Sequence, residues 1–312
     1  VPVFAMGILP LTETSRDLPP AGLGMLPAKS FVGRRRQDLL RFVANRILFA
    51  KPHKLLLRIL HQYGVEPVGA NVFDLNARKA TLLLQSGTPS FEYFRSDLGR
   101  NVRFVGALLP WRKPATGNAW FDERLNQYDK VLLLTQGTVE KDANKLLIPV
   151  LKAFAQTDCL VVCTTGGSGT EELREQFAAD NVIIEDFIPF GDVLPYADVY
   201  VTNGGYGGVL LALEHGVPLV VAGLHEGKNE ICARVGYFEL GINLCTETPS
   251  SMRLREAVDR VLSGPVYAHN AQKMAAEIAH YPTNDLCAHY MAEVLGAQPL
   301  VLSRTSAIEN IF

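Results

Sequence analysis

The sequence predicts an α/β fold in which parallel sheets are covered by helices. Two observations lead to this prediction. Continuous apolar runs alternate with segments of helical spacing through residues 128–296, and such runs are typical of strands that are buried on both faces of a parallel sheet. One of these runs, ending near residue 202, passes through a glycine-rich turn into a helix-like segment. In such sheets, ligands bind at the carboxyl ends of the strands.

The N-terminal third of the chain contains fewer regular elements. Residues 1–8 have the pattern of a buried strand, and residues 13–28 form a loop that is rich in proline and glycine. Short strands are expected at 80–85 and 101–106. Because an interior strand of a doubly wound sheet normally has crossover helices on both sides, we interpret the chain as beginning within a domain.

Residues 29–62 form a basic segment, with nine lysines or arginines against one acid, Asp38. Apolar residues recur in this segment at helical spacing. One interpretation is a helix pair that makes peripheral contact with a membrane surface. We favour helices that cover a sheet and turn a solvated basic face outward, because Pro52 divides the segment and its apolar face suits a core. An apolar surface that lines the site of a lipophilic substrate is compatible with that interpretation.

A stretch of proline, glycine and polar residues after residue 108 predicts a domain boundary. We expect an incomplete N-terminal domain at residues 1–108, a linker at 109–127 and a C-terminal domain at 128–296. In the C-terminal domain, strands are expected at 130–134, 160–164, 181–185, 199–202 and 218–222. Helices are expected at 144–156, 171–178, 191–196, 209–215, 228–237, 251–262, 267–280 and 284–295. The start of the first of these helices is left open, because Pro149 is tolerated only in a first turn.

The glycine-rich turn follows the strand at 199–202. Residues 204–208 contain four glycines in five positions, and a helix is expected to begin at once. Backbone amides are therefore left bare at a helix N-terminus, which is an anion site by construction. Glycines serve any tight turn, so the turn by itself supports a structural and a binding role about equally.

Four motifs in order give this region a specific resemblance. They are Thr135-Gln136-Gly137-Thr138, Phe187-Ile188-Pro189-Phe190, Thr202 to Gly208 continuing to Pro218, and Glu226 to Glu230 leading to Ala233-Arg234-Val235. Residues 128–262 resemble the C-terminal, nucleotide-sugar-binding domain of GT-B fold, family 1 glycosyltransferases of the UDP-glycosyltransferase-like, macrolide and flavonoid type. The N-terminal half is similar more loosely, through Phe91-Glu92-Tyr93 and Arg103 to Gly106. The resemblance implies two Rossmann-like domains with parallel sheets, the N-terminal one being a partial acceptor-binding domain. It also implies that the tail, residues 297–312, packs back towards the N-terminal part.

The resemblance implies a role for each residue of the donor site. The diphosphate would be bound by Gly137, Thr138, Asn203, Gly204, Gly205, Tyr206, Gly207 and Gly208. Phe187 would stack on the pyrimidine, the backbone of Ile188 would bond the base edge, and Glu226 and Lys228 would bind the sugar. Structural alternatives exist: a strand-end turn for Thr138, a core position for Phe187 and an exposed loop for the two charged residues. Asn203 stands where many relatives carry a histidine, and its amide donates to phosphate without charge.

The resemblance also bears on the donor and the reaction. Leu211 stands where plant relatives place an acid that binds the ribose hydroxyls, so a 2′-hydroxyl would find no partner there. We therefore expect a dTDP-sugar such as dTDP-rhamnose, with UDP-glucose close behind. Fixed donors at the diphosphate would stabilise the charge that develops as the sugar leaves. The implied reaction is an inverting, metal-independent transfer to a hydroxyl of a lipophilic acceptor such as a flavonoid.

A catalytic base is not identifiable. Inverting relatives use a histidine close to the start of the N-terminal domain, and no histidine precedes His53 in this sequence. His53 and His61 lie in the basic segment, where packing or surface roles are expected. We therefore predict that this chain binds nucleotide but catalyses negligible transfer by itself. The alternative is a non-catalytic nucleotide- or glycan-binding module.

Composition narrows the remaining classes of function. The net charge of −2 gives no bulk attraction to nucleic acid. The five cysteines are odd in number and form no CxxC pair, which argues against a disulfide framework or a zinc cage. We expect a cytoplasmic protein without a membrane span, a metal site or a cofactor other than the nucleotide-sugar co-substrate. A dinucleotide-dependent Rossmann enzyme is disfavoured, because no acid placed to hold a ribose follows the turn at the usual distance.

Overall fold

The computed structural model describes residues 1–69, 71–108 and 119–297. The chain divides into two compact units, and each is described by itself. Unit 1 comprises Val1–Leu108 together with the chain from Ile278 onward, and unit 2 comprises Leu109–Glu277. The expected C-terminal domain at 128–296 differs from this division, because the last described helix belongs to unit 1. Residues 109–118 of the predicted linker and residues 298–312 of the predicted tail lie outside the described residues.

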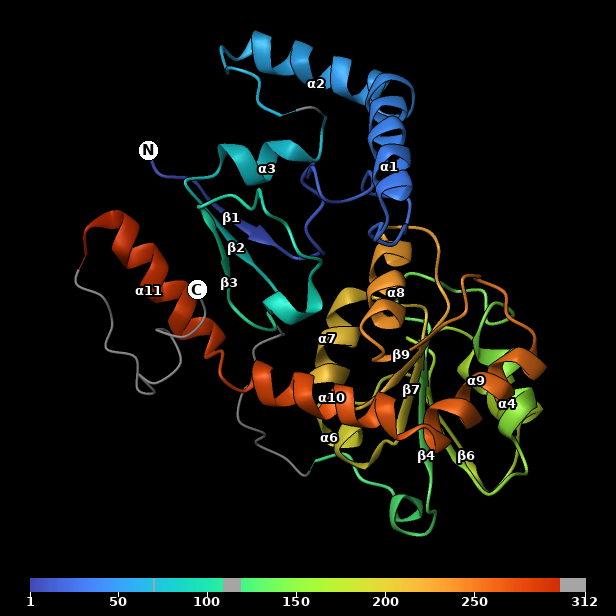
Figure 1. Ribbon diagram of the computed structural model, residues 1–312. Coiled ribbons are helices and arrows are strands. Elements are labelled where there is room, and N and C mark those ends of the chain that lie inside the picture. The colour runs from blue at the N-terminus through green and yellow to red at the C-terminus, as the bar shows by residue number, and fades with distance from the viewer. Residues whose placement is uncertain (70, 109–118, 298–312) are drawn as a thin grey trace. The chain divides into compact units, whose positions relative to one another are not determined.

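Unit 2 contains a six-stranded parallel sheet in the order β6-β5-β4-β7-β8-β9 (Figure 1). The strands are β4 (Val131–Thr135), β5 (Leu160–Thr164), β6 (Val182–Glu185), β7 (Val199–Thr202), β8 (Leu219–Val221) and β9 (Gly241–Asn243). The chain moves outward in one direction from β4 to β6 and in the other from β7 to β9. The boundary between β4 and β7 is therefore a topological switch point, where sheets of this kind bind ligands.

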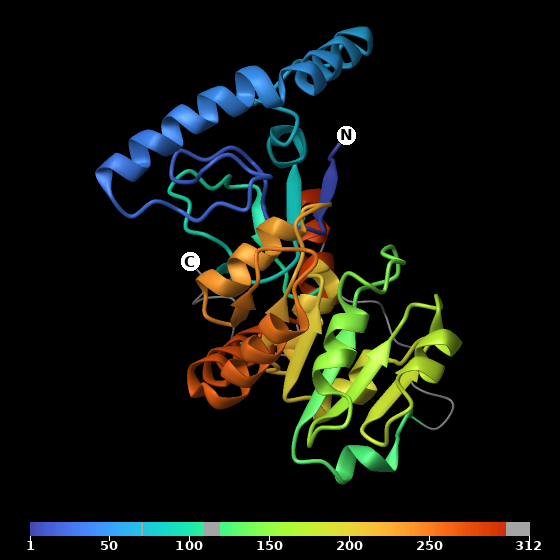
Figure 2. The ribbon, with the colours of Figure 1, turned by 90° about the vertical axis from the view of Figure 1, so that its right-hand side faces the viewer.

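Helices cover both faces of the sheet of unit 2 (Figures 1 and 2). They are α4 (Leu147–Phe154), α5 (Thr170–Gln176), α6 (Phe190–Val193), α7 (Tyr206–Glu214), α8 (Lys228–Tyr237), α9 (Ser251–Ser263) and α10 (Pro265–Ile278), with 3₁₀ turns at Glu123–Asn126 and Leu194–Tyr196. α4 and α9 bury their apolar faces in one core with the strands; Leu147, Val150 and Leu254 in that core have no exposed surface. α4 begins at Leu147, not at 144, because Pro149 can occupy only the first turn.

Unit 1 contains a three-stranded parallel sheet in the order β1-β2-β3. Its elements are β1 (Phe4–Gly7), α1 (Phe31–Val43), a π-helical segment (Ala44–Leu48), α2 (Ala50–Gln62), α3 (Asp74–Lys79), β2 (Leu82–Gln85), a 3₁₀ turn (Pro89–Phe91), β3 (Val102–Phe104) and α11 (Thr283–Leu295). α11 joins this unit because Leu286 and Cys287 pack against Leu84 and Val105. A helix from the end of the chain therefore completes the core formed by its beginning.

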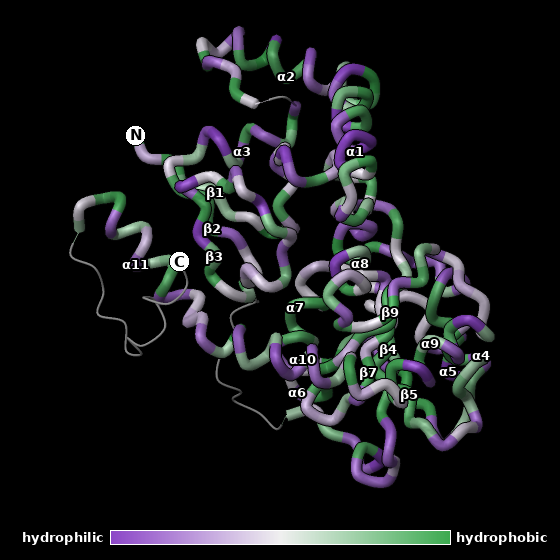
Figure 3. Tube along the Cα trace, in the orientation of Figure 1, coloured by the Kyte–Doolittle hydropathy of each residue, from purple (hydrophilic) through white to green (hydrophobic). Residues whose placement is uncertain are grey.

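The basic segment at 29–62 is helical, but the expected burial of its apolar face is wrong. Phe31, Leu39, Phe42 and Ile47 are each more than 60% exposed. The residues of α1 and the π-helical segment that are buried are Gln37 and Ala44, which lack the apolar area of a core face. Hydrophobic and hydrophilic residues alternate along α1 and α2 (Figure 3). None of the helices in the described part of the chain is long and apolar enough to span a membrane.

Candidate functional site

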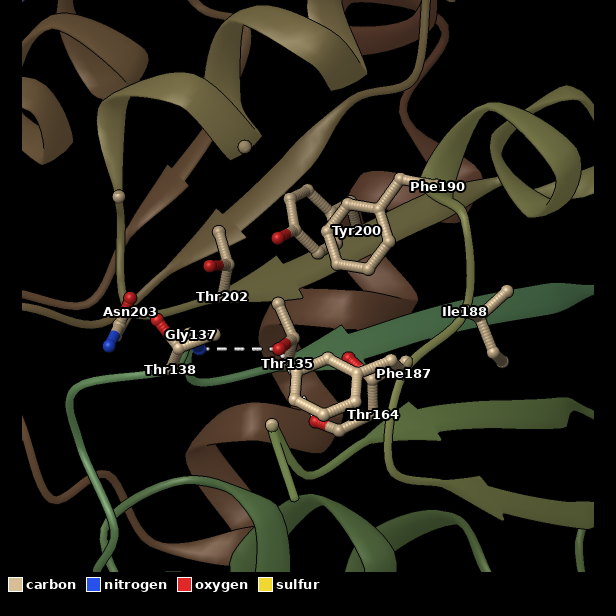
Figure 4. A pocket seen from close by; sticks show the side chains of 13 residues that line it. Thr135, Gly137, Thr138, Thr164, Phe187, Ile188, Phe190, Tyr200, Thr202 and Asn203 are labelled. Carbon is tan, nitrogen blue, oxygen red and sulfur yellow. Dashed lines mark hydrogen bonds between the residues drawn. The ribbon is translucent and has the colours of Figure 1, made fainter. Parts of the chain in front are cut away.

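The switch point of unit 2 opens into a pocket of about 230 Å³, which we call the switch-point pocket. Three threonines at strand ends form its floor: Thr135 is in register with Thr164 of β5 on one side and with Thr202 of β7 on the other. Asn203 and Thr138 lie at one end of the pocket, and Ile188 lies at the other (Figure 4). The full lining comprises Thr135, Gly137, Thr138, Thr164, Gly166, Phe187, Ile188, Phe190, Tyr200, Thr202, Asn203, Gly205 and Gly208.

The loops around the pocket are closed by threonine hydroxyls at the strand ends. The Oγ1 of Thr135 accepts from the amide of Gly137 at 3.2 Å, and the Oγ1 of Thr202 accepts from the amide of Gly204 at 3.4 Å. Both glycines have a positive φ, 77° and 85°, a conformation that glycine adopts without strain. Hydroxyl-closed turns of this kind bend the chain sharply. They bring the backbone of each following loop to the edge of the pocket.

The N-terminus of α7 lies where the sequence predicts an anion site. Gly205 is its N-cap, and no side chain in the described part of the chain caps the helix. Gly205 and Gly208 line the pocket, and a Cβ on Gly208 would lie 3.0 Å from the hydroxyl of Tyr200. The first-turn amides of a helix have no intrahelical acceptors and favour negative charge. The pocket is therefore open to an anion on this side.

Gly204, Tyr206 and Gly207 are not among the residues that line the pocket. A Cβ on Gly204 would lie 2.5 Å from the Sγ of Cys232, so this glycine allows close packing against α8. The side chain of Tyr206 is buried, and no atom would contact a Cβ on Gly207 within 4 Å. For Gly204 the structure therefore shows a packing role, whereas the first-turn amides of Tyr206 and Gly207 lie at the helix end described above.

Asn203 joins the two loops that frame the pocket. Its Nδ2 donates a hydrogen bond to the backbone oxygen of Gln136, which fixes the loop after β4 to the loop after β7. An amide nitrogen carries two hydrogens, so one remains for another acceptor. Asn203 also lines a smaller neighbouring hollow, which we call the polar hollow, formed with Gln136, Glu140, Lys145, Leu146, Ala222, Lys228 and Glu247.

The aromatic position of the pocket is exposed. The side chain of Phe187 is 65% exposed, which contradicts the alternative that it is a core residue. Its ring lies beside Gly167, where a Cβ would lie 3.2 Å from the ring, so the lack of a side chain leaves room for it. Ile188, the next residue, is buried. An exposed aromatic face on a buried support is a surface on which a planar ring can stack.

Glu226 and Lys228 lie outside the switch-point pocket. They form an ion pair with each other at 2.7 Å, in which the Lys228 side chain is mostly buried and that of Glu226 is largely exposed. Lys228 lines the polar hollow beside Asn203, whereas Glu226 does not. Glu226 has a φ of 56°, and Gly227 after it has a φ of 79°. The tight turn at the start of α8 thus holds the lysine inward and the glutamate outward.

Sequence reasoning missed several residues of this site. Tyr200 and Phe190 line the pocket, with ring centroids 5.9 Å apart. Burial raises the pKa of Tyr200, which remains a neutral hydroxyl. The threonines at three strand ends were a signal in the sequence that could have identified them as pocket residues, since parallel strands end at the same edge of a sheet. Glu247, in the loop after the unpredicted strand β9, had no such signal.

These features define an α/β protein with a doubly wound sheet. A pocket at the switch point of that sheet combines a helix N-terminus, which favours negative charge, with an exposed aromatic ring. Residues 149–294 match the family described as the erythromycin biosynthesis protein CIII-like C-terminal domain. The chain is 39% identical to the 4′-demethylrebeccamycin synthase of Lentzea aerocolonigenes over 267 residues, which are 85% of this chain and 62% of that protein. It is 35% identical to UDP-glucosyltransferase 1 of Beauveria bassiana, over 85% of this chain and 59% of that protein. The chain therefore spans about three fifths of the length of these relatives.

Solved structures agree with the sequence relatives. The calicheamicin glycosyltransferase CalG4 is similar with a TM-score of 0.64 and 26% identity, covering 78% of this chain and 60% of that chain. The glycosyltransferase VinC, solved in complex with dTDP, shares the fold with a TM-score of 0.54 and 19% identity, over 84% of this chain and 62% of that chain. The chain therefore has UDP-glycosyltransferase homologues and GT-B glycosyltransferase structural neighbours, which agrees with the family predicted from the sequence and confirms the predicted fold class. Its homologues are glycosyltransferases of the natural-product type.

Proposed function

We propose that this protein binds a nucleoside diphosphate sugar in the switch-point pocket and that the reaction it serves is inverting sugar transfer. One observation carries the proposal. The pocket combines an exposed aromatic ring, Phe187, with the uncapped N-terminus of α7. A ring that stacks on a base and amides that bind an anion are the two features that a pyrimidine diphosphate requires.

The arrangement also suits the chemistry of transfer. As the bond between the sugar and the diphosphate breaks, negative charge develops on the leaving group. Amide donors that are already in place, at Thr138, Gly205 and Gly208, stabilise the transition state, in which this charge develops, more strongly than they stabilise the ground state. Asn203 adds a neutral donor. We propose that these donors act without a metal ion. Within the described residues, no group of three His, Cys, Asp or Glu side chains is placed to hold one, and metal independence stays a prediction.

Glu226 and Lys228 are proposed as the sugar-binding residues. Lys228 lies beside Asn203 in the polar hollow, which supports a position close to the diphosphate. Glu226 is on the exposed side of the same turn. Their mutual ion pair has to rearrange, or to present both groups together, when sugar hydroxyls bind.

The nature of the donor follows from Leu211. An apolar side chain at this position offers no partner to a 2′-hydroxyl, so we propose a dTDP-sugar, with rhamnose as the first candidate and UDP-glucose as the second. Titration calorimetry with dTDP, UDP and NAD tests this order. We expect dTDP to bind more tightly than UDP, and NAD to show no heat. Binding of NAD alone would overturn the proposal.

The acceptor is proposed to be a hydroxyl of a lipophilic small molecule such as a flavonoid. No catalytic base is assigned, and no histidine is among the residues that line the switch-point pocket. We therefore propose that this chain by itself binds donor but transfers sugar negligibly. The alternative function is a non-catalytic nucleotide- or glycan-binding module. Product analysis by mass spectrometry tests whether the purified chain transfers sugar. Robust turnover would refute both the expected inactivity and the non-catalytic alternative.

A cytoplasmic location and an absence of nucleic-acid binding stay predictions. Peripheral contact of residues 29–62 with a membrane is the less favoured partner proposal, and one observation supports it. Exposed phenylalanines of this segment carry arginines over their rings, Arg35 over Phe31 at 5.1 Å and Arg46 over Phe42 at 5.8 Å. Basic and aromatic groups on one face suit an anionic interface. Flotation with anionic and with neutral vesicles tests it, and equal absence from both would exclude it.

A further inference from the structure

Glu247, a charged side chain of the polar hollow, accepts hydrogen bonds from backbone amides of the loop between β8 and α8, residues 222–227. Its Oε1 accepts hydrogen bonds from the backbone amides of Leu224, at 3.3 Å, and His225, at 3.1 Å. Its Oε2 lies 3.5 Å from the Nζ of Lys145. Neither amide bond belongs to a helix or a strand, so the carboxylate takes the place that secondary structure fills elsewhere.

The charges around Glu247 form a chain. Lys145 also pairs with Glu140 at 2.5 Å, and its Nζ therefore lies between two carboxylates. Burial alone would raise the pKa of Glu247, but the amide hydrogen bonds from His225 and Leu224 and the nearby ammonium of Lys145 hold that pKa below its ordinary value. The carboxylate is thus ionised at neutral pH, and hydrogen bonds to an ionised acceptor are the stronger kind.

The loop held in this way leads directly to the sugar-binding candidates. At its start, a Cβ on Gly223 would lie 2.0 Å from the backbone oxygen of Asn203, so the loop backbone packs directly on the residue that follows β7. At its end, the amide of Lys228 donates to the backbone oxygen of His225 at 3.0 Å. Glu247 bonds Leu224 and His225, two of the four residues between Gly223 and Lys228. Its two hydrogen bonds therefore hold the part of the loop that directly precedes Glu226 and Lys228.

We propose that Glu247 is a positioning residue for the donor sugar: it holds the loop between β8 and α8 so that Glu226 and Lys228 face the sugar. This proposal rests on the proposed function, in which these two residues bind the sugar while Phe187 and the N-terminus of α7 bind the nucleoside diphosphate. In this proposal, the residues that bind the sugar and those that bind the nucleoside diphosphate are held in place by different parts of unit 2. Loss of Glu247 affects the residues that bind the sugar.

The test compares a nucleoside diphosphate with the corresponding nucleotide sugar by calorimetry. Glu247→Ala removes the acceptor of two amides, and we expect about tenfold weaker binding of the nucleotide sugar, with less than about twofold change for the diphosphate. Glu247→Gln keeps an oxygen acceptor but loses the charge, so its affinity for the nucleotide sugar should lie between those of wild type and Glu247→Ala. Glu256→Ala, which removes an exposed carboxylate from α9, is the matched control and should bind as wild type. Equal losses for both ligands, or no loss for either, would contradict the proposal.

Hydrogen exchange separates this proposal from the proposed function. We expect the amides of Leu224 and His225 to exchange faster in Glu247→Ala than in wild type, while those of the strands do not change. Unchanged protection there overturns the positioning role, whatever binds. If wild type binds neither dTDP nor UDP, the proposed function fails, and the exchange result still decides whether Glu247 holds the loop. Should Glu247→Ala not fold, Glu247→Gln and Lys145→Met carry the same comparison.

Discussion

Replacement of Phe187 by alanine separates binding from folding at the switch-point pocket. The ring is 65% exposed, so at most about 70 Å² of its surface is buried in the fold. At 25 cal/mol per Å², truncation lowers the free energy of unfolding by at most about 2 kcal/mol. Stacking of an aromatic ring on a base is worth about 1–3 kcal/mol, which corresponds to about 5- to 150-fold in affinity. We therefore expect Phe187→Ala to remain folded and to bind dTDP or UDP that much more weakly.

The assay is titration calorimetry of both nucleotides, with thermal unfolding measured on the same samples. Phe187→Trp keeps a ring and should retain affinity. Phe94→Ala is the matched control, because Phe94 is 79% exposed and lies in unit 1. Unchanged affinity in Phe187→Ala, or an equal loss in Phe94→Ala, would refute the assignment of Phe187 to the base.

Three further predictions follow from particular contacts. Gly208→Ala places a Cβ 3.0 Å from the Tyr200 hydroxyl, so nucleotide affinity should fall and the added Tyr200→Phe change should restore part of it; no rescue would show that the crowding lies elsewhere. The hydrogen bond from Arg124 lowers the pKa of Asp122 from 3.8, so the ionised carboxyl stabilises the fold above that pH and loses this effect as the pH falls through the lowered pKa. The deficit of Asp122→Asn in chemical unfolding should therefore vanish in acid, and a deficit that persists there would contradict the ion pair. At pH 8 iodoacetamide should label the exposed Cys245 first, because burial raises to about 12 the pKa of three other thiols, those of Cys159, Cys163 and Cys232; early labelling of these three would contradict the packing.

Most of the sheet of unit 2 could be predicted from the sequence, because its strands are continuous apolar runs. The strand at Gly241–Asn243 was missed, since three residues beginning with glycine carry no periodic signal. Its glycine has a spatial cause: a Cβ there would lie 1.9 Å from the backbone oxygen of Leu219 on the neighbouring strand. That contact exists only once the strands are paired.

The basic segment at 29–62 shows a different limit. Helical periodicity predicted helices correctly, but it does not state what an apolar face packs against. α11 shows the same limit in reverse. Its spacing predicted a helix, whereas its membership of unit 1 depends on contacts of Leu286 and Cys287 with Leu84, about two hundred residues away in the sequence.

The candidate site divides in the same way. Ordered motifs predicted Gly137, Thr138, Phe187, Ile188, Asn203 and the glycines of the turn as site residues. Seven of these line one pocket: Gly137, Thr138, Phe187, Ile188, Asn203, Gly205 and Gly208. Glu247 could not be predicted, because it bonds the loop after β8 from the loop after β9. A side chain that serves backbone amides at a distance in the sequence leaves no local pattern.

A crystal structure with dTDP or UDP at saturating concentration is the most direct measurement of the central claim. We expect the pyrimidine to lie on the ring of Phe187, and the phosphates to accept hydrogen bonds from the first-turn amides of α7. Nucleotide that lies in any other part of the chain, or a pocket that stays empty under these conditions, would contradict the account.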